Sequence, residues 1–229
     1  MQSSYESNPV SYEDPKGGQY VDEEVQLRLG FIRKVYLILG AQLLLTAFVV
    51  QLIQAAGVEW AQENGGLLMV SIIASFVCIF ALYCVKNNYP INLIVLGVFT
   101  LCESFLVGFI TLFYDQAVVS QAVWTTALIF VGLTIYAFTT KTDFTTMHGV
   151  AFSLLLALVI ISIFGMFSDS EFLHLAIAWF GVCLFSLYII IDTQIIMKDL
   201  SLDDYVLGAI MLYLDIINLF LYLLKLFSR

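Results

Sequence analysis

Residues 205–224 read YVLGAIMLYLDIINLFLYLL, an apolar run whose single acid, Asp215, stands near its middle. A run of about 20 such residues is long enough to cross the ~30 Å hydrocarbon core of a bilayer as a helix. A charged carboxylate at that depth costs roughly 2.5 to 3.5 kcal/mol, so an intramembrane acid is a functional-site hypothesis by default. The run therefore predicts a transmembrane helix, and its acid favours a protein that moves ions or protons.

The composition of the 229-residue chain indicates an integral membrane protein. With 61% hydrophobic residues, 12% charged residues and a mean hydropathy of +0.96, the chain has too little polar surface to cover a soluble globule. Its four cysteines all lie in apolar stretches, so we expect no disulfide framework. The net charge of −9 comes mostly from the tail and loops, which argues against a nucleic-acid partner.

Apolar runs separated by short polar loops continue through most of the chain. Their continuous hydrophobicity favours helices over the alternating strands of a membrane barrel. We therefore expect an all-α integral membrane protein, a seven-transmembrane-helix bundle that forms one domain over residues 25–229. The predicted spans are residues 35–56, 67–85, 91–113, 117–138, 149–167, 172–197 and 205–226.

The first 24 residues differ from the rest in composition. They contain two prolines, several acids and no apolar segment of the kind that a signal peptide needs. Such a segment cannot bury enough apolar surface to offset the entropy of ordering. We expect residues 1–24 to form a disordered acidic tail in the cytosol.

The basic residues set the orientation, because short loops rich in Lys and Arg stay cytosolic. Alternate loops carry all of them, and the intervening loops carry only acids. The N-terminus is therefore predicted to be cytosolic. The residues that decide this are Arg28, Arg33, Lys34, Lys86, Lys141 and Lys198.

The end of the chain departs from this charge pattern. Seven complete crossings place Lys225 and Arg229 on the side opposite the other basic residues. Either the last run crosses completely, or it re-enters around Asp215 and returns to the cytosol. Complete crossing is favoured, because a re-entrant backbone needs special partners for its polar groups.

Helical geometry gives the depth of three intramembrane acids. At 1.5 Å per residue, Asp215 and Glu103 lie near the bilayer centre, while Asp192 lies on the order of 7 Å from the cytosolic end of its span. The short loop after residue 198 makes the last two helices antiparallel neighbours, so Asp192 and Asp215 can face each other. No Lys or Arg lies deep enough in a span to neutralise them.

Two carboxylates in a low-dielectric site cannot both ionise cheaply, so the pair is expected to titrate as one unit. With one proton the acids can share a hydrogen bond; without it they repel and offer oxygen ligands to a hard cation such as calcium. Asn218 and Tyr188, each one helical turn from an aspartate, are candidate supporting residues. A purely structural role for the acids is the alternative, particularly for Glu103.

Several short motifs together resemble the Bax inhibitor (TMBIM) family and, within it, the Golgi group of the Lifeguard branch. The resemblance covers nearly everything from Leu29 to the C-terminus, and the two aspartate motifs are its most specific part. The motifs are RKVY (33–36), FYD (113–115), FVGLTIY (130–136), KTDF (141–144), IDTQ (191–194), LSLDDYVL (200–207) and LYLDIINLFL (212–221).

This resemblance implies a seven-helix protein of Golgi or endoplasmic reticulum membranes, a pH-sensitive calcium leak and protection against apoptosis. Asp192 and Asp215 correspond to the family's pH sensor and to a transient calcium site, and Glu103 to a possible second ion site. The resemblance implies no cofactor, with calcium as the permeant ion. Its implied partners are the lipid bilayer, calcium ions, protons, and cell-death regulators or other calcium channels.

Two positions depart from the family pattern. The loop after the sixth span usually carries paired glutamates, and here it carries Asp203 and Asp204. Near the start of the sixth span a glutamate is expected, but His174 stands there, with Glu171 one turn before it. Glu171 and His174 are the candidates for a luminal ion entrance, and a histidine could add pH sensitivity. A packed interfacial histidine is the alternative.

Two other functional classes remain open. The chain could be an anti-apoptotic regulator that acts by binding partners, without ion flux of its own. An intramembrane aspartyl protease also uses two membrane aspartates, but the residues around Asp192 and Asp215 do not match its motifs. We therefore do not expect an enzyme.

Overall fold

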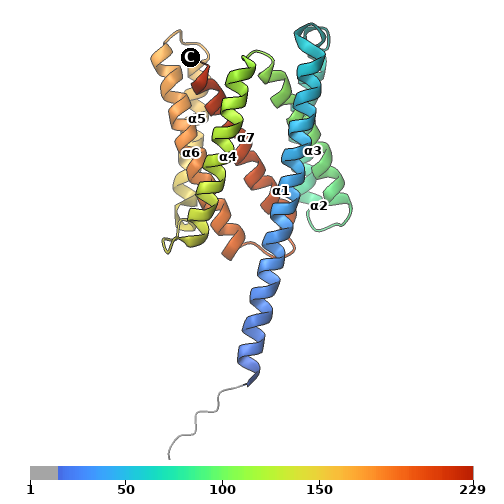
Figure 1. Ribbon diagram of the computed structural model, residues 1–229, viewed down its shortest axis with the longest axis vertical. Helices are drawn as coiled ribbons and strands as arrows, with labels where there is room; N and C mark the ends of the chain where they lie inside the picture. The colour runs from blue at the N-terminus through green and yellow to red at the C-terminus, as the bar shows by residue number, and fades with distance from the viewer. Residues whose placement is uncertain (1–14, 229) are drawn as a thin grey trace, which may run out of the picture.

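The computed structural model describes residues 15–228, with side chains from residue 23 onward, and this part of the chain is helical throughout apart from its loops (Figure 1). Seven of its helices are long and apolar enough to cross a membrane, so the predicted all-α, seven-helix class is confirmed. In chain order the elements are α1 (Pro15–Glu63), α2 (Gly65–Val85), α3 (Ile91–Thr111), α4 (Gln116–Thr139), the short 3-10 helix η1 (Thr145–Met147), α5 (His148–Gly165), α6 (Glu171–Lys198) and α7 (Tyr205–Phe227).

The first helix is longer than the sequence predicts. It begins at Pro15, inside the segment 1–24 that the sequence predicts to be a disordered tail, and the rest of that tail lies outside the described residues. Proline suits the first turn of a helix, and the segment that follows continues without a break into the first span. Arg28 donates a hydrogen bond of 2.6 Å to the Leu200 carbonyl, which ties this extension to the α6–α7 loop. Gly57, with φ of 84°, interrupts the helix near its other end.

Helix α7 is the centre of the bundle. It packs against α1, α3, α4 and α6, and Figure 1 shows α1, α2 and α3 on one side of it and α4, α5 and α6 on the other. Because it is surrounded by protein, its side chains are covered on nearly all faces; Leu212, Tyr213 and Leu219 have no exposed surface. The apolar stretch 205–224 thus forms the core of the fold.

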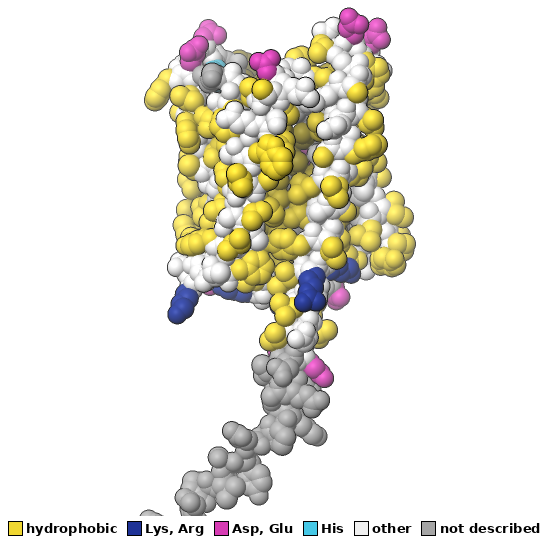
Figure 2. Space-filling model, in the orientation of Figure 1, with side chains coloured by type: hydrophobic (Ala, Val, Ile, Leu, Met, Phe, Trp, Pro, Cys, Tyr) yellow, Lys and Arg dark blue, Asp and Glu magenta, His cyan; other side chains and the backbone are white. Residues whose placement is uncertain are grey.

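The two ends of the bundle differ in charge (Figure 2). Lys and Arg side chains lie at the end from which α1 projects, and acids mark the opposite end. At the basic end, Lys86 forms an ion pair of 2.8 Å with Asp204, and the ammonium of Lys34 lies 3.2 Å from the centre of the Tyr205 ring. By the positive-inside rule this end faces the cytosol.

The last span resolves the two alternatives for the end of the chain. Helix α7 runs without a break from the basic end to the opposite end, where the C-terminus lies (Figure 1). The re-entrant alternative is therefore wrong. A continuous helix satisfies its own backbone hydrogen bonds, which a re-entrant loop at the same depth could not do unaided.

Close packing of α6 against α7 generates a stability prediction. A Cβ atom placed on Gly181 of α6 would lie 2.5 Å from the Tyr222 ring of α7, whereas one on Gly132 of α4 would meet nothing within 4 Å. We expect Gly181→Ala to destabilise the protein by about 1 to 3 kcal/mol, the usual effect of overpacking. Gly132→Ala should leave stability unchanged or raise it by up to ~1 kcal/mol, because alanine is the better helix former.

Thermal unfolding in detergent measures both variants against the parent protein. A melting temperature that falls for Gly181→Ala and not for Gly132→Ala is the expected result. Equal melting temperatures for the two variants would show that the α6–α7 contact has room for a methyl group.

Candidate functional site

Asp192 of α6 and Asp215 of α7 meet at the interface between these two helices. Each is 5% exposed. Their carboxyl groups are within hydrogen-bonding reach of each other. The expected juxtaposition of the two acids is thus present in the structure, and it depends on the short loop 199–204 that returns α7 alongside α6.

One oxygen of each carboxyl group has no hydrogen-bond partner in the described part of the chain. Asp192 Oδ1 and Asp215 Oδ2 are buried and receive no hydrogen bond from any described residue. Both ion pairs in the described part of the chain involve other acids, Asp204 and Asp143. Two ionised carboxylates can only accept hydrogen bonds, so a proton on one of them is what would satisfy both.

The two supporting residues that the sequence suggests make their described contacts with groups other than the aspartates. Asn218 donates its side-chain amide to the Leu214 carbonyl on its own helix, at 2.8 Å. The Tyr188 ring packs edge to face against His148, with 6.5 Å between ring centres, and its hydroxyl makes no hydrogen bond to Asp192 among the described residues. Neither side chain thus bonds an aspartate among the described residues, although Tyr188 lies close enough to both carboxyl groups for their charges to act on its hydroxyl.

Glu103 is separate from the aspartate pair. It lies on α3, half-buried, and its carboxyl group is next to the hydroxyl of Ser75 on α2. The prediction that Glu103 lies near the bilayer centre agrees with its place in the middle of α3. The structure does not bring it to Asp192 or Asp215, so any ion site at Glu103 would be a second, distinct one.

A buried chain of hydroxyl groups connects α1, α3 and α7, and it was not among the predicted site residues. Ser104 donates to Thr46 at 2.9 Å, and Thr46 is 2.9 Å from the hydroxyl of Tyr213, two residues before Asp215. Gln42 donates to Thr100 at 3.0 Å. The sequence signal was available: Gln42 and Thr46, like Thr100 and Ser104, are polar pairs four residues apart within apolar runs, which places each pair on one face of its helix.

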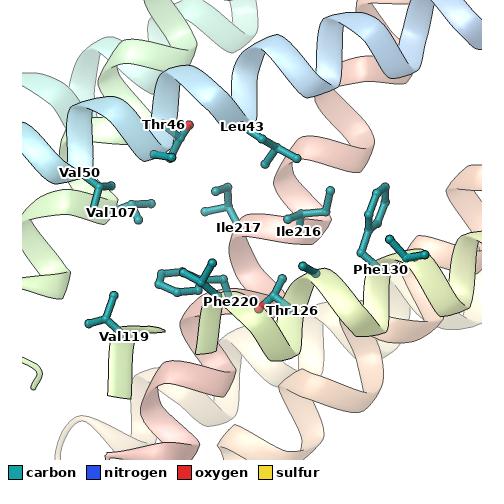
Figure 3. A pocket seen from close by; sticks show the side chains of 14 residues that line it. Leu43, Thr46, Val50, Val107, Val119, Thr126, Phe130, Ile216, Ile217 and Phe220 are labelled. Carbon is teal, nitrogen blue, oxygen red and sulfur yellow. The ribbon is translucent and has the colours of Figure 1, made fainter. Parts of the chain in front are cut away.

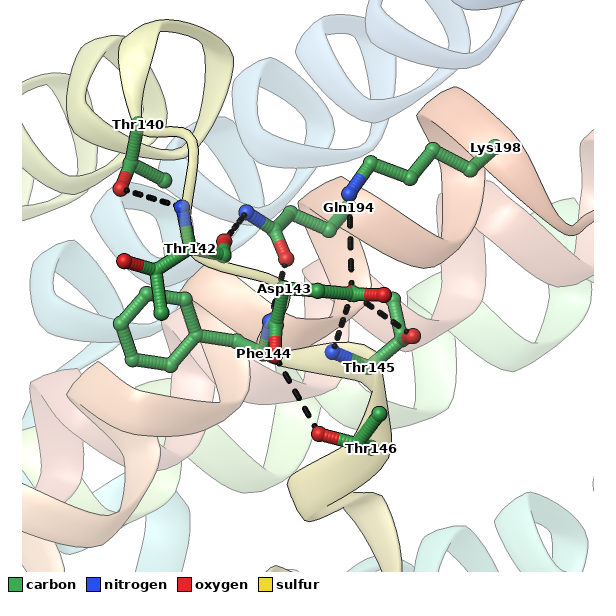
Figure 4. A network of polar contacts seen from close by, with 8 residues as sticks. All are labelled: Thr140, Thr142, Asp143, Phe144, Thr145, Thr146, Gln194 and Lys198. Carbon is green, nitrogen blue, oxygen red and sulfur yellow. Dashed lines mark hydrogen bonds and ion pairs between the residues drawn. The ribbon is translucent and has the colours of Figure 1, made fainter.

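A second polar network fixes the cytosolic loop between α4 and α5 (Figure 4). The side chain of Gln194, fully buried on α6, accepts from the Phe144 amide at 2.7 Å and donates to the Thr142 carbonyl at 2.9 Å. Asp143 accepts from the amide and the hydroxyl of Thr145 and lies 3.5 Å from the ammonium of Lys198. Gln194, which lies two residues after Asp192 near the cytosolic end of α6, therefore attaches the α4–α5 loop to this helix.

The acid at the centre of this loop has a defined pH response. The hydroxyl and amide of Thr145, and to a smaller extent Lys198, lower the pKa of Asp143. Its stabilising contribution is complete above the ordinary aspartate pKa of about 3.9 and is lost as the pH falls through the lower folded value. Because this ion pair is exposed, its contribution is small, and the buried Gln194 bonds carry most of the loop's attachment.

The remaining predicted residues lie at the two ends of the bundle. On the far side, Glu171 occupies the first turn of α6, where a negative charge suits the helix dipole. A ring nitrogen of His174 lies 2.9 Å from the Ser168 carbonyl and closes the α5–α6 loop. On the cytosolic side Asp203 is exposed, and Asp204 is paired with Lys86. The hydrogen bond from Lys86 to Asp204 raises the pKa of that lysine.

No described residues form a cluster of three or more His, Cys, Asp or Glu side chains of the kind that holds a resident metal ion. The aspartate pair supplies two carboxyl groups. Calcium usually takes six to eight oxygen ligands. A calcium ion at the pair would therefore need further oxygens, such as water, and could bind there only in passing.

The Gln194 network generates a prediction about the loop. Gln194→Leu keeps the side-chain volume but leaves the Phe144 amide and the Thr142 carbonyl without partners, at about 1 to 3 kcal/mol for a lost buried hydrogen bond. We expect hydrogen exchange in the loop 140–147 to accelerate about tenfold or more. Asp143→Asn, which removes the exposed ion pair, is the matched control and should change exchange much less. Equal exchange rates in the parent and Gln194→Leu would contradict the attachment.

Comparison with known proteins places this architecture in a family. The family model described as "Inhibitor of apoptosis-promoting Bax1" matches residues 28–229. Protein lifeguard 4 of Mus musculus is 40% identical over 212 residues, which are 91% of this chain and 89% of that protein. The Golgi anti-apoptotic protein of Vaccinia virus (strain Lister) is 38% identical, over 92% and 90% of the two chains. The chain therefore belongs to the Bax inhibitor family, in its Lifeguard branch, as a multi-pass anti-apoptotic protein of Golgi or endoplasmic reticulum membranes.

Proposed function

We propose that the protein is a pH-sensitive calcium leak channel that lowers store calcium and is gated by Asp192 and Asp215. The observation that supports this most directly is the contact between two buried carboxyl groups that have no cationic partner among the described residues. Buried acids inside a membrane bundle are expensive and mark ion or proton pathways. The leak would lower the calcium content of the store and so protect the cell against apoptosis. This agrees with the anti-apoptotic names of the relatives.

The closed state follows from one shared proton. With it, one carboxyl group donates to the other and links α6 to α7 inside the bundle. Since α7 also contacts α1, α3 and α4, a fixed α7 keeps all five helices together. Low pH therefore favours the closed state.

The open state follows from loss of that proton. Two unit charges about 4 Å apart at an effective dielectric constant of 20 repel by ~4 kcal/mol, enough to change the ratio of two conformations by on the order of 10³. The same ionised oxygens are ligands suited to a hard cation. A rise in pH thus separates α6 from α7 and creates a transient binding site in a single step.

A second candidate is a regulator that binds partner proteins and conducts no ions. The names of the relatives support it, because they record protection against apoptosis and no transport. In this function the shared proton of Asp192 and Asp215 only stabilises the bundle. The proposed channel contains no catalytic step, and the matching family is described as an inhibitor of apoptosis-promoting Bax1.

Calcium efflux from liposomes distinguishes these functions. We expect the reconstituted parent protein to release calcium faster as the pH rises. Asp192→Asn and Asp215→Asn should each abolish the pH dependence, because an amide donates a hydrogen bond to the remaining carboxyl group at every pH. Glu103→Gln, an intramembrane acid outside the pair, and Asp203→Asn, an exposed loop acid, are the matched controls and should keep the parent response.

Two results would overturn the proposal. A normal pH response in both aspartate variants would exclude the pair as the sensor. Absence of flux in folded parent protein, together with intact protection of cells by Asp215→Asn, would favour the partner-binding regulator.

A further inference from the structure

An apolar groove opens on the face of the bundle between α1 and α4, which belong to opposite sides of α7. Its volume is about 270 Å³, and Figure 3 shows its side chains pointing into the space between the helices. The back wall is formed by α7 through Ile216, Ile217 and Phe220. Two threonines reach it, and both hydroxyls are already hydrogen-bonded, Thr46 to Tyr213 and Thr126 to the Ala122 carbonyl.

The lining decides what can fill the groove. An engineered cavity of about 150 Å³ lined by Leu, Ile and Phe stays dry and accepts hydrocarbon. The lining of this larger groove is also apolar, so it offers water no free hydrogen-bond partners and favours hydrocarbon. The entrance is framed by exposed side chains, among them Val123 and Val131 of α4. These lie within a membrane span, and the yellow hollow on the front of the space-filling view marks the same face. The medium in contact with the groove is therefore the hydrocarbon of the bilayer.

The dimensions favour a thin chain over a helix. Along α4 the lining extends from Val119 to Val131, about 18 Å at 1.5 Å per residue. This is slightly more than half of the ~30 Å hydrocarbon core, the depth of one leaflet. A helix 10 Å wide and equally long would occupy roughly 1,400 Å³, more than all the empty space in the groove, which is about 850 Å³ with its open side included. One extended acyl chain matches the groove in length.

A polar mouth continues the groove toward the non-cytosolic end. It is a pocket of about 420 Å³ built on α1, α3 and α4, three of the four helices that line the groove, about one turn further along each. Gln51 and Gln54 follow Ala47 and Val50 on α1, Thr111 follows Val107 on α3, and Gln116 precedes Val119 on α4. The residues that line it also include Tyr114, and none of those described carries a charge. Amides and hydroxyls bind a headgroup by hydrogen bonds and without a preference for anions.

We propose that the groove and its mouth form a binding site for one bilayer lipid of the non-cytosolic leaflet, with an acyl chain along α4 and a neutral or zwitterionic headgroup among the glutamines. Because the chain would lie against Ile216 and Ile217, the residues directly after Asp215, it would support α7 on the side away from α6. Lipid binding at this site does not require the proposed channel activity.

Photolabelling tests the site in a membrane. The full chain is placed in nanodiscs of phosphatidylcholine that contain a trace of phosphatidylcholine with a diazirine in the middle of one acyl chain, and the labelled residues are mapped by mass spectrometry. We expect labels concentrated on α1 and α4 residues of the groove. Ala47→Phe fills the groove and should abolish this labelling. Ala41→Phe, the same change at an exposed alanine of α1 outside the groove, should not.

Two further measurements keep the test decisive. Val123→Phe fills the groove from α4 and serves if Ala47→Phe does not fold. Gln54→Leu alters only the mouth and should lower the amount of phosphatidylcholine that stays bound in native mass spectrometry. Unlabelled phosphatidylglycerol should compete with the probe no better than phosphatidylcholine, because the described lining of the mouth carries no positive charge. Labelling spread evenly over all lipid-facing helices, or equal labelling in the filled variants and the parent, would show surrounding lipid only. Cross-links to a second protein would show a different occupant. Either result would overturn the proposal.

Discussion

The structure depends on one constraint: inside hydrocarbon, every polar group must find its partner within the protein. Helices meet this requirement for the backbone. Most buried hydroxyls meet it by bonding to a carbonyl of their own helix, as Thr100 and Thr126 do, or to each other, as Thr46 and Tyr213 do. Asp192 and Asp215 place two acceptors side by side, and each has a buried oxygen without a donor among the described residues, so a proton from outside would complete the pair. A buried polar group without a hydrogen-bond partner in the described protein is a place where the proton concentration outside can influence the fold.

The central position of α7 joins the parts of the molecule that have chemical interest. One face of the helix presents Asp215 to α6, another presents Tyr213 to the hydroxyl chain of α1 and α3, and a third forms the back wall of the lipid-facing groove. These three environments share one rigid element. A small rotation of α7 would therefore change all of them together, which is how a local proton transfer can alter a bundle of this size.

Much of this could be predicted from the sequence, and what could not has a physical reason. Hydropathy and charge depend on composition along the chain, so the seven spans and the basic end followed directly from them. The contact between Asp192 and Asp215 could be predicted because a short loop forces neighbouring helices together. Spacing along a helix suggested Asn218 and Tyr188 as supporting residues, but it does not say whether a side chain bonds its own backbone, as Asn218 does, or a neighbour. Gln194 and the groove were missed because both depend on α4, whose distance from α6 and α1 is set by packing.

The projecting part of α1 has a mechanical consequence. The helix is continuous from Pro15 to the break at Gly57, and the bond from Arg28 to the Leu200 carbonyl holds it where it leaves the bundle. From Pro15 to Arg28 it extends for about 20 Å, and on the other side of that bond the same helix lines the apolar groove with Thr46, Ala47 and Val50. The helix can therefore act as a rigid rod that pivots about the Arg28–Leu200 hydrogen bond. Anything that pushes its cytosolic arm sideways would tilt the opposite arm, which forms one wall of the bundle.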